Sequence, residues 1–302
     1  MVSYLYSTTK KSKGETNMKK GKKGKKIAIG IGCVALACAI GAGAWLTTVR
    51  VQSKKHNLIT IDTSSLPEPV SGPVKEDDVQ LSEVKMHYAV YGEKGHPLIL
   101  VHGNGGSHKS LEEAALYLAN DYTVYAIDSR CHGQSSDPDE ISYDLMAKDI
   151  KEFIEAMKLE KPYILGHSDG GINALTVAYT YPDLLGGFVS CGANTSPDTM
   201  KPYFILGVKF NDRGRHDKLN EMMLTLPQID AQKLSKIQCP AYIVAGEHDI
   251  MYLSDTVLIH DSIKDSKIAI IKGADHSSYI SHDGKSAYVL AHEFFQSLES
   301  EQ

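Results

Sequence analysis

The sequence contains few cysteines, and none of its five forms a C-x-x-C pair with another. Cys33 and Cys38 lie in a long apolar stretch, and the other three are isolated at positions 131, 191 and 239. An isolated cysteine usually behaves as a small buried hydrophobic residue. The cysteines therefore suggest neither a disulfide framework nor a zinc site, and we expect neither a metal ion nor a cofactor.

Features that bind nucleotides or nucleic acid are also missing. A glycine-rich stretch at residues 102–107 follows an apolar run, but it lacks both G-x-x-x-x-G-K and G-x-G-x-x-G. The chain carries 32 basic and 37 acidic residues. Residues 1–26 hold nine of the basic residues and one acidic residue, so the remainder has 23 against 36, a net charge of −13. Such an acidic remainder argues against nucleic acid as a partner.

Charge is absent from residues 27–49 altogether. These 23 uncharged, mostly apolar residues are enough to cross a hydrocarbon core, which takes about 20 residues at helical rise. Many lysines precede this stretch and few basic residues follow it. The positive-inside rule then predicts a basic cytoplasmic tail at 1–26, a single-pass transmembrane anchor at 27–49, and an extracytoplasmic remainder in the cell membrane.

Two other interpretations of this segment stay open. The Ala-Gly-Ala at residues 42–44 fits the cleavage site of a secretory signal peptide. Cys38, at the end of residues 34–38, resembles the lipidated cysteine of a lipoprotein. The apolar run continues past both sites to Val49, which favours an uncut anchor. Met18 heads the basic run and is an alternative start.

Residues 50–78 are rich in proline and serine and end in an acidic run, which predicts a linker. Residues 79–302 are long enough for one sizeable domain. Strand-like apolar runs alternate there with helical patterns, which predicts an α/β fold with a mostly parallel sheet and helices on both faces. The expected strands are 84–91, 97–101, 122–127, 162–166, 185–191, 241–246 and 267–271. The expected helices are 111–118, 142–159, 172–180 and 286–298.

This alternation breaks at about residues 195–235, where large apolar residues are scattered among polar ones. The pattern indicates a short helical cap over the site, and surface helices packing on a small core of their own are the alternative. Under the first interpretation, the cap supplies four substrate-binding residues: Tyr203, Phe204, Met222 and Met223.

Residues 166–170 read G-H-S-D-G, between an apolar run and a helical pattern. A G-x-S-x-G sequence in this context predicts a nucleophile elbow, a sharp strand-to-helix turn that exposes the serine hydroxyl. The glycines are needed because side chains there would collide with neighbouring backbone. Ser168 is therefore the expected nucleophile.

Ser168, Asp249 and His276 each follow the end of an expected strand, where open α/β sheets build their sites. His276 would take the proton from Ser168, and Asp249 would orient the imidazole and stabilise its charged form. The rival acids are Glu247 and Asp275; the rival histidines are His248 and His282. We expect His102, His132 and His167 to form structural hydrogen bonds in loops.

The backbone N–H groups of Asn104 and Asp169 are the expected oxyanion hole. The side chain of Asp169 has two interpretations. An ionised carboxylate facing the acyl pocket would favour substrates with a cationic amine close to the scissile carbonyl. Alternatively, the carboxylate caps the following helix or makes another structural bond.

With these residues assembled, the domain resembles the α/β-hydrolase superfamily. The resemblance rests on five motifs in order: H-G-N-G-G-S at 102–107, D-S-R-C-H-G-Q-S-S at 128–136, G-H-S-D-G-G at 166–171, G-E-H-D at 246–249 and D-H at 275–276. The S-D-G-G elbow is similar to that of valacyclovir-hydrolase-like and ring-cleavage hydrolases. Relatives usually carry glycine where this chain has Cys131, so we expect a slightly different or strained loop there. The short cap also departs from relatives with larger lids.

The resemblance implies a serine hydrolase that cleaves a small ester, lactone or amide through an acyl-enzyme. Serine at position 168 excludes the dehalogenase and epoxide-hydrolase chemistry that uses an aspartate nucleophile. The alternatives are a C–C bond hydrolase or acyltransferase of the same fold, and a catalytically silent hydrolase-fold binding protein.

Overall fold

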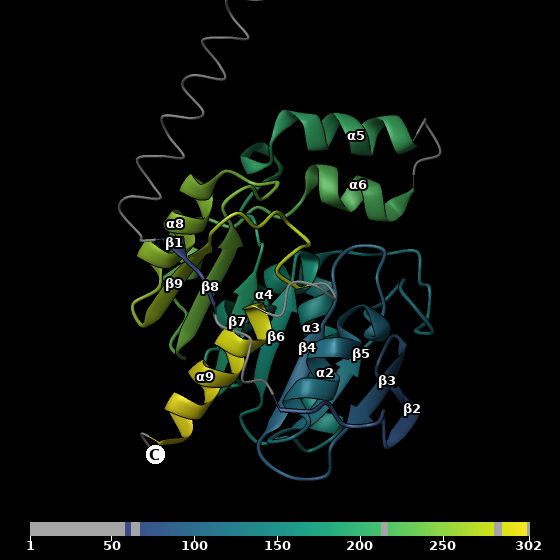
Figure 1. Ribbon diagram of the computed structural model, residues 1–302. Coiled ribbons are helices and arrows are strands. Elements are labelled where there is room, and N and C mark those ends of the chain that lie inside the picture. Colours follow the sequence, from purple (N-terminus) through teal and green to yellow (C-terminus); the bar gives the residue numbers. More distant parts are fainter. Residues whose placement is uncertain (1–57, 62–66, 213–216, 281–285, 301–302) are drawn as a thin grey trace, which may run out of the picture. The chain divides into compact units, whose positions relative to one another are not determined.

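The computed structural model describes residues 58–61, 67–212, 217–280 and 286–300 (Figure 1). The expected tail and anchor at 1–49 lie outside the described residues, as does His282. Within the described ranges, no helix is both long and apolar enough to span a bilayer.

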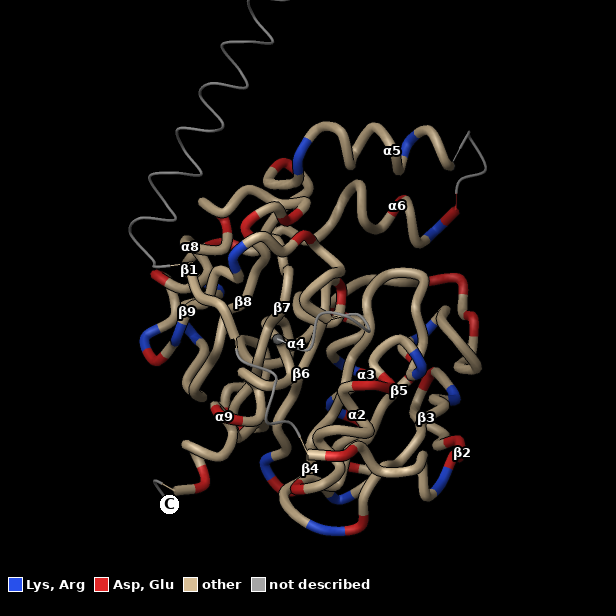
Figure 2. The backbone as a smooth tube through the Cα atoms, viewed as in Figure 1, with Lys and Arg blue, Asp and Glu red and all other residues tan. Residues whose placement is uncertain are grey.

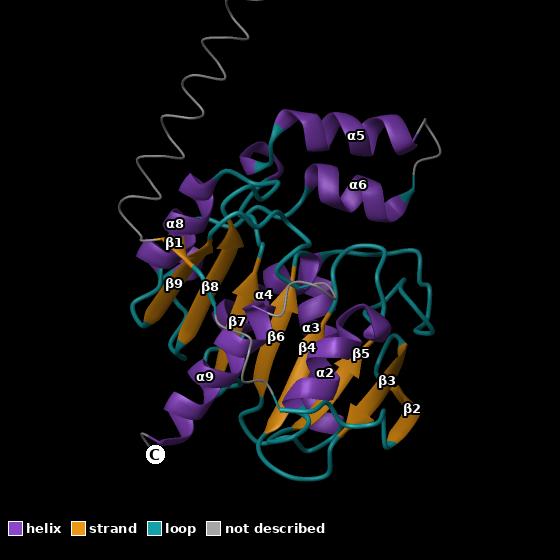
Figure 3. Cartoon of the chain, viewed as in Figure 1, coloured by secondary structure: helices purple, strands orange, loops and turns teal. Residues whose placement is uncertain are grey.

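A single sheet of nine strands organises the described residues, in the order β1-β9-β8-β7-β6-β4-β5-β3-β2 (Figure 3). The strands are β1 (Leu58–Ile59), β2 (Lys75–Gln80), β3 (Lys85–Tyr91), β4 (Pro97–Val101), β5 (Thr123–Ile127), β6 (Tyr163–His167), β7 (Gly187–Cys191), β8 (Ala241–Gly246) and β9 (Ser266–Ile271). In this spatial order, the strands β1, β9, β8, β7, β6, β4 and β5 each pair in parallel with the next one. The strand β3 pairs antiparallel with both β5 and β2. The predicted α/β fold with a mostly parallel sheet is confirmed, and its seven expected strands are all present.

The linker prediction for residues 50–78 is wrong where β1 and β2 pair into the sheet. The sequence of β2, K-E-D-D-V-Q, lacks the apolar alternation of a half-buried strand, and most of its residues are exposed. Figure 2 shows basic and acidic positions along this strand at the edge of the sheet. Edge strands tolerate such charge because only one side of the backbone is paired, and charge discourages further strands from adding.

Helices cover the two faces of the sheet with separate cores. On one face, α3 (Tyr143–Ala156), α4 (Asp169–Thr180) and α8 (Leu253–Ser262) pack against residues such as Ile99 and Ile164. On the other face, α2 (Glu112–Leu118) and α9 (Ser286–Ser300) pack against residues such as Leu100 and Leu165. Successive strand residues enter opposite cores because side chains alternate across a strand. This is why a buried parallel strand reads as a continuous apolar run.

The expected insertion at 195–235 is helical in the structure. It contains η2 (Pro197–Thr199), α5 (Pro202–Asp212), α6 (Lys218–Thr225) and α7 (Ala231–Leu234). In Figure 1, α5 and α6 lie beyond the carboxyl ends of the strands. Met200, just before α5, forms an isolated antiparallel β-bridge with Met251, which follows β8. Met222 of α6 belongs to the large core that contains α3 and α4, so the alternative of a separate small core is wrong at this position.

Candidate active site

The turn between β6 and α4 has the geometry of a nucleophile elbow. Ser168 adopts φ 55° and ψ −118°, a backbone conformation that costs a non-glycine residue about 1–3 kcal/mol. A Cβ on Gly166 would lie 2.1 Å from the carbonyl oxygen of Gly170, and a Cβ on Gly170 would lie 1.9 Å from that of Val101. Both glycines are therefore required for β6 to turn directly into α4.

Ser168, His276 and Asp249 form one chain of hydrogen bonds. The distance from Ser168 Oγ to His276 Nε2 is 3.0 Å, and that from His276 Nδ1 to Asp249 Oδ1 is 2.6 Å. The three side chains follow β6, β9 and β8, whose parallel pairing brings their carboxyl ends to the same edge of the sheet. The structure thus brings together the three residues predicted from the sequence.

Asp249 is fully buried, and four donors surround its carboxylate. Oδ1 accepts from His276 and from the amide of Ile250 (2.8 Å), and Oδ2 accepts from the amide of Gly246 and the hydroxyl of Tyr279, both at 3.0 Å. Burial by itself raises the pKa of Asp249, but the hydrogen bonds and the charge of His276 hold that pKa below its ordinary value. The carboxylate therefore stays ionised and can fix the imidazole with Nδ1 protonated.

The rival acids have other partners. Glu247 accepts from the amide of Gly273 at 2.9 Å. Asp275 accepts from the amides of Ser277 and Ser278 at 3.0 and 2.9 Å, and these bonds shape the turn that carries His276. His248, the rival histidine within the described residues, is exposed.

The three histidines expected to be structural bond to loop backbone, as predicted. His167 Nε2 lies 2.9 Å from the carbonyl oxygen of His276, and His132 Nδ1 lies 2.8 Å from that of Arg130. His102 Nδ1 lies 2.7 Å from the carbonyl oxygen of Gly103, while its Nε2 accepts from the amide of Ser129 at 3.1 Å. Burial lowers the pKa of both His102 and His167 to about 4, so both are neutral at pH 7.

Because burial keeps the imidazoles of His102 and His167 neutral, we expect the folded protein to lose stability in mild acid. Their folded pKa of about 4 lies below the unfolded value of 6.5, so the unfolded chain binds more protons between these pH values. Stability therefore falls as the pH drops from about 6.5 towards about 4, by up to about 3 kcal/mol for each histidine. We expect the Tm of the full chain to fall over this range. The fall should be smaller in His167→Gln, which keeps a donor for the His276 carbonyl; an unchanged pH profile in this variant would contradict the argument.

The predicted oxyanion loop lies directly against the elbow. A Cβ added to Gly103 would lie 3.0 Å from the Cβ of Ser168. The side-chain amide of Asn104 donates to Asp169 Oδ2 at 3.0 Å and approaches the carbonyl oxygen of Leu219 on α6 at 3.4 Å. The amide of Asp169 lies in the first turn of α4, where a helix offers no backbone acceptor. The loop, the elbow and the cap therefore meet at Asn104.

The carboxylate of Asp169 makes structural bonds, but not those of a helix cap. Oδ1 accepts from the hydroxyl of Tyr143 at 2.8 Å, and Oδ2 accepts from Asn104. Burial raises the pKa of Asp169, and these two bonds oppose that rise. The capping interpretation is wrong because the side chains of Tyr143 and Asn104, rather than the amides of α4, approach the carboxylate.

The four predicted substrate-binding residues have different environments. Tyr203 is 61% exposed on α5, and Phe204 and Met223 are half-buried. Met222 is 3% exposed and packs in the large core, which does not favour a role in binding. Only tertiary contacts identify the further residues Tyr143, Tyr279 and Lys201. Lys201 is buried, and its Nζ donates a hydrogen bond to the carbonyl oxygen of Asp249. This bond joins the start of α5 to the loop after β8 that carries Asp249.

The loop after β5 contains the strained residue predicted there. Cys131 adopts φ 64°, the left-handed conformation that favours glycine. The neighbouring Arg130 is buried and pairs with Asp149 of α3 through two bonds of 2.6 and 2.7 Å, which anchors the loop to the helix layer.

Comparison with known proteins agrees with this architecture. Residues 96–234 match the family model described as alpha/beta hydrolase fold. The chain is 30% identical over 233 residues to the human serine hydrolase BPHL, an alignment that covers 67% of this chain and 80% of that protein.

Two solved structures show the same fold. The enol-lactonase from Burkholderia xenovorans LB400 is similar with a TM-score of 0.60 at 15% identity, covering 72% of this chain and all of that one (100%). A thermophilic esterase from Thermogutta terrifontis gives a TM-score of 0.60 at 18% identity, covering 74% and 99%. This chain is a hydrolytic enzyme and belongs to the α/β-hydrolase family.

Proposed function

We propose that the protein is a serine hydrolase that cleaves a small ester, lactone or amide through an acyl-enzyme. The observation that carries this proposal is the hydrogen-bonded chain from Ser168 Oγ through His276 to Asp249, with distances of 3.0 and 2.6 Å. A serine hydroxyl is a weak nucleophile alone, and it needs an adjacent base that is itself oriented.

The mechanism follows from these contacts. Ser168 Oγ attacks the carbonyl carbon while His276 Nε2 takes the hydroxyl proton, and Asp249 stabilises the imidazolium. The amides of Asn104 and Asp169 stabilise the tetrahedral oxyanion. When the intermediate collapses, the proton passes from His276 to the leaving group. Water then attacks the acyl-enzyme with His276 again as base, and this step releases the acid and restores Ser168.

The decisive experiment is to trap the acyl-enzyme. The full-length protein is mixed with a panel of activated esters, quenched and analysed by peptide mass spectrometry. We expect the acyl mass on the peptide that contains Ser168. Turnover of a vinylogous diketone without ester turnover would instead favour a C–C hydrolase, and transfer of the acyl group to an added alcohol would favour an acyltransferase. Absence of both adduct and turnover would favour a silent binding protein.

Asp169 is expected to act as a positioning residue for the oxyanion loop. In Asp169→Asn, an oxygen can still accept from Tyr143, but the new amide group opposes the donor of Asn104. We expect kcat to fall by up to about 10²-fold, the lower range for loss of an oxyanion donor, and KM to change little. The loss should be equal for an aminoacyl ester and its des-amino analogue.

The matched control for this prediction is Tyr143→Phe, which removes one bond to the same carboxylate but leaves Asn104 paired. It should cost less than Asp169→Asn. A preference of the wild type for the amine-bearing ester that disappears in Asp169→Asn would instead favour recognition of a cationic amine by Asp169.

We also propose that the enzyme domain is extracytoplasmic and tethered to the cell membrane by residues 27–49. The uncharged run and the lysines before it support this arrangement. Protease added to intact cells should then degrade the domain, and recovery of the full-length protein in the cytosolic fraction would count against it. The mass of the mature N-terminus distinguishes an uncut anchor from cleavage at 42–44 or lipidation of Cys38.

A further inference from the structure

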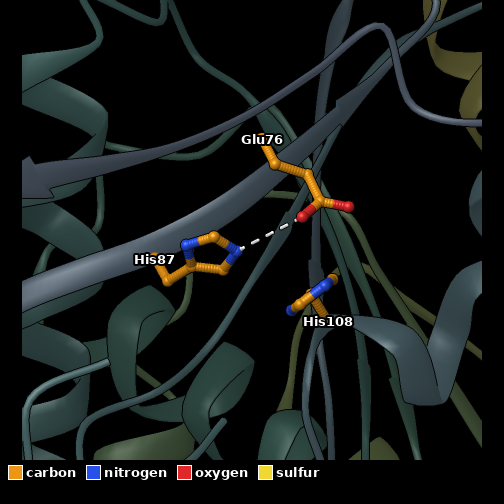
Figure 4. Close-up of side chains that lie close together, drawn as sticks. All are labelled: Glu76, His87 and His108. Carbon is orange, nitrogen blue, oxygen red and sulfur yellow. Dashed lines mark ion pairs between the residues drawn. The ribbon is translucent and has the colours of Figure 1, made fainter. Parts of the chain in front are cut away.

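A second cluster of titratable side chains lies at the β2–β3 edge of the sheet, outside the Ser168 site (Figure 4). Glu76 comes from β2, His87 from β3, and His108 from the short 3₁₀ helix η1 (His108–Leu111). One ligand atom from each residue lies within 4.8 Å of the others. Strand register explains half of this arrangement, because His87 pairs with Asp78 and is therefore the diagonal neighbour of Glu76.

Each imidazole in this cluster is oriented by a carboxylate on its Nδ1 side. His87 Nδ1 lies 2.9 Å from Asp78 Oδ1, and His108 Nδ1 lies 2.9 Å from Asp128 Oδ1. Asp128 is fully buried and also accepts from the amides of His108 and Gln134. A proton on Nδ1 leaves the lone pair on Nε2, which is how carboxylates orient histidine ligands in metal sites.

The Nε2 atom of His108 is buried and has no hydrogen-bond partner among the described residues. The side chain is only 2% exposed, and no group in the described ranges forms a hydrogen bond with this nitrogen. Leaving such a buried polar atom without a partner destabilises the fold. His87 Nε2 lies 3.9 Å from Glu76 Oε2, on the same side of the cluster (Figure 4). Glu76, His87 and His108 thus each offer one ligand atom within 4.8 Å of the ligand atoms of the other two.

The donor types select the class of ion. Two imidazole nitrogens and one carboxylate oxygen suit zinc and similar divalent transition metals, whereas calcium and magnesium prefer oxygen ligands. With zinc–ligand bonds of about 2.0–2.1 Å, tetrahedral ligand atoms lie about 3.4 Å apart. The exposed side chain of Glu76 can close the remaining gap by rotation. The side-chain amide of Gln134, which lies 3.0 Å from His87 Nε2, must turn away to free that lone pair.

We propose that Glu76, His87 and His108 bind one zinc-class divalent ion, with water in the fourth position. The ion connects edge strands β2 and β3 to η1, which follows directly on the oxyanion loop at 102–107. It would therefore stabilise the sheet edge and the far end of that loop. The proposal does not depend on hydrolysis at Ser168. No sequence motif reveals the site, because the ligands are 11 and 21 residues apart and meet only through strand pairing and the β4–η1 connection.

The test uses the untagged full-length chain, stripped with a chelator and titrated with Zn²⁺ by calorimetry, and with Co²⁺ by visible spectroscopy. Glu76→Gln removes the exposed ligand without disturbing the core, and Glu93→Gln is the matched control at an exposed glutamate outside the cluster. We expect one more equivalent of tightly bound Zn²⁺ in the wild type and Glu93→Gln than in Glu76→Gln. Removing a ligand should weaken binding by at least the roughly 10–100-fold typical of an orienting partner.

Binding at this site should also stabilise the fold. At Zn²⁺ about 100-fold above the wild-type dissociation constant, Tm should rise by roughly 5–10 °C for a domain of this size in the wild type and in Glu93→Gln, and by about half of that or less in Glu76→Gln. Four-coordinate Co²⁺ absorption should follow the same pattern. Equal Zn²⁺ affinity and equal Tm shifts in wild type and Glu76→Gln, or no binding to either, would overturn the proposal.

Discussion

Ser168→Ala is expected to lower kcat for a small ester by about 10⁶-fold, to the residual rate supplied by binding and the oxyanion hole. The reason is that the elbow presents Ser168 Oγ to His276 Nε2, at 3.0 Å. A hydrolysis assay measures the loss, and a fluorophosphonate probe should label the wild type but not the variant. Alanine also occupies the strained backbone conformation, so the circular dichroism spectrum and Tm of the variant should remain close to those of the wild type.

The companion variants test whether Ser168 and His276 act as a unit. His276→Ala should cost about as much as Ser168→Ala, and the double variant should be no worse than either. Additive losses would show that the two side chains act independently. Equal probe labelling of wild type and Ser168→Ala would place the nucleophile elsewhere in the chain.

Asp249→Asn is expected to lower kcat by about 10⁴-fold with little change in KM. The present carboxylate accepts the Nδ1 proton of His276 at 2.6 Å. An amide group can present N–H to Nδ1 instead, which stabilises the tautomer that carries its proton on Nε2 and cannot accept one from Ser168. The buried amide also cannot stabilise the imidazolium formed during attack.

Glu247→Gln provides the matched control for Asp249→Asn, because it makes the same chemical change at a rival acid after the same strand. Its oxygen can still accept from the amide of Gly273, so kcat should stay within a few-fold of the wild type. A large loss in Glu247→Gln with a small loss in Asp249→Asn would reverse the assignment of the orienting acid.

The sequence by itself determined the parts of this protein that depend on neighbouring residues. The elbow could be predicted because its glycines and serine lie within five positions, and steric exclusion at Gly166 and Gly170 acts over the same short range. The central strands could be predicted because burial on both faces requires continuous apolar runs. The positions of Asp249 and His276 followed, since parallel strands bring their carboxyl ends to one edge.

Tertiary structure alone decided the features that depend on distant partners. The charged strand β2 has no apolar pattern, and only its pairing with β3 makes it a strand. The carboxylate of Asp169 accepts hydrogen bonds from Tyr143 and Asn104, which are 26 and 65 residues away. Sequence spacing therefore could not distinguish a helix cap from hydrogen bonds to these distant side chains. The same holds for Tyr279 on Asp249 and for the cluster at His108. A hydrogen bond depends on distance and direction in space, and chain folding sets both for residues far apart in sequence.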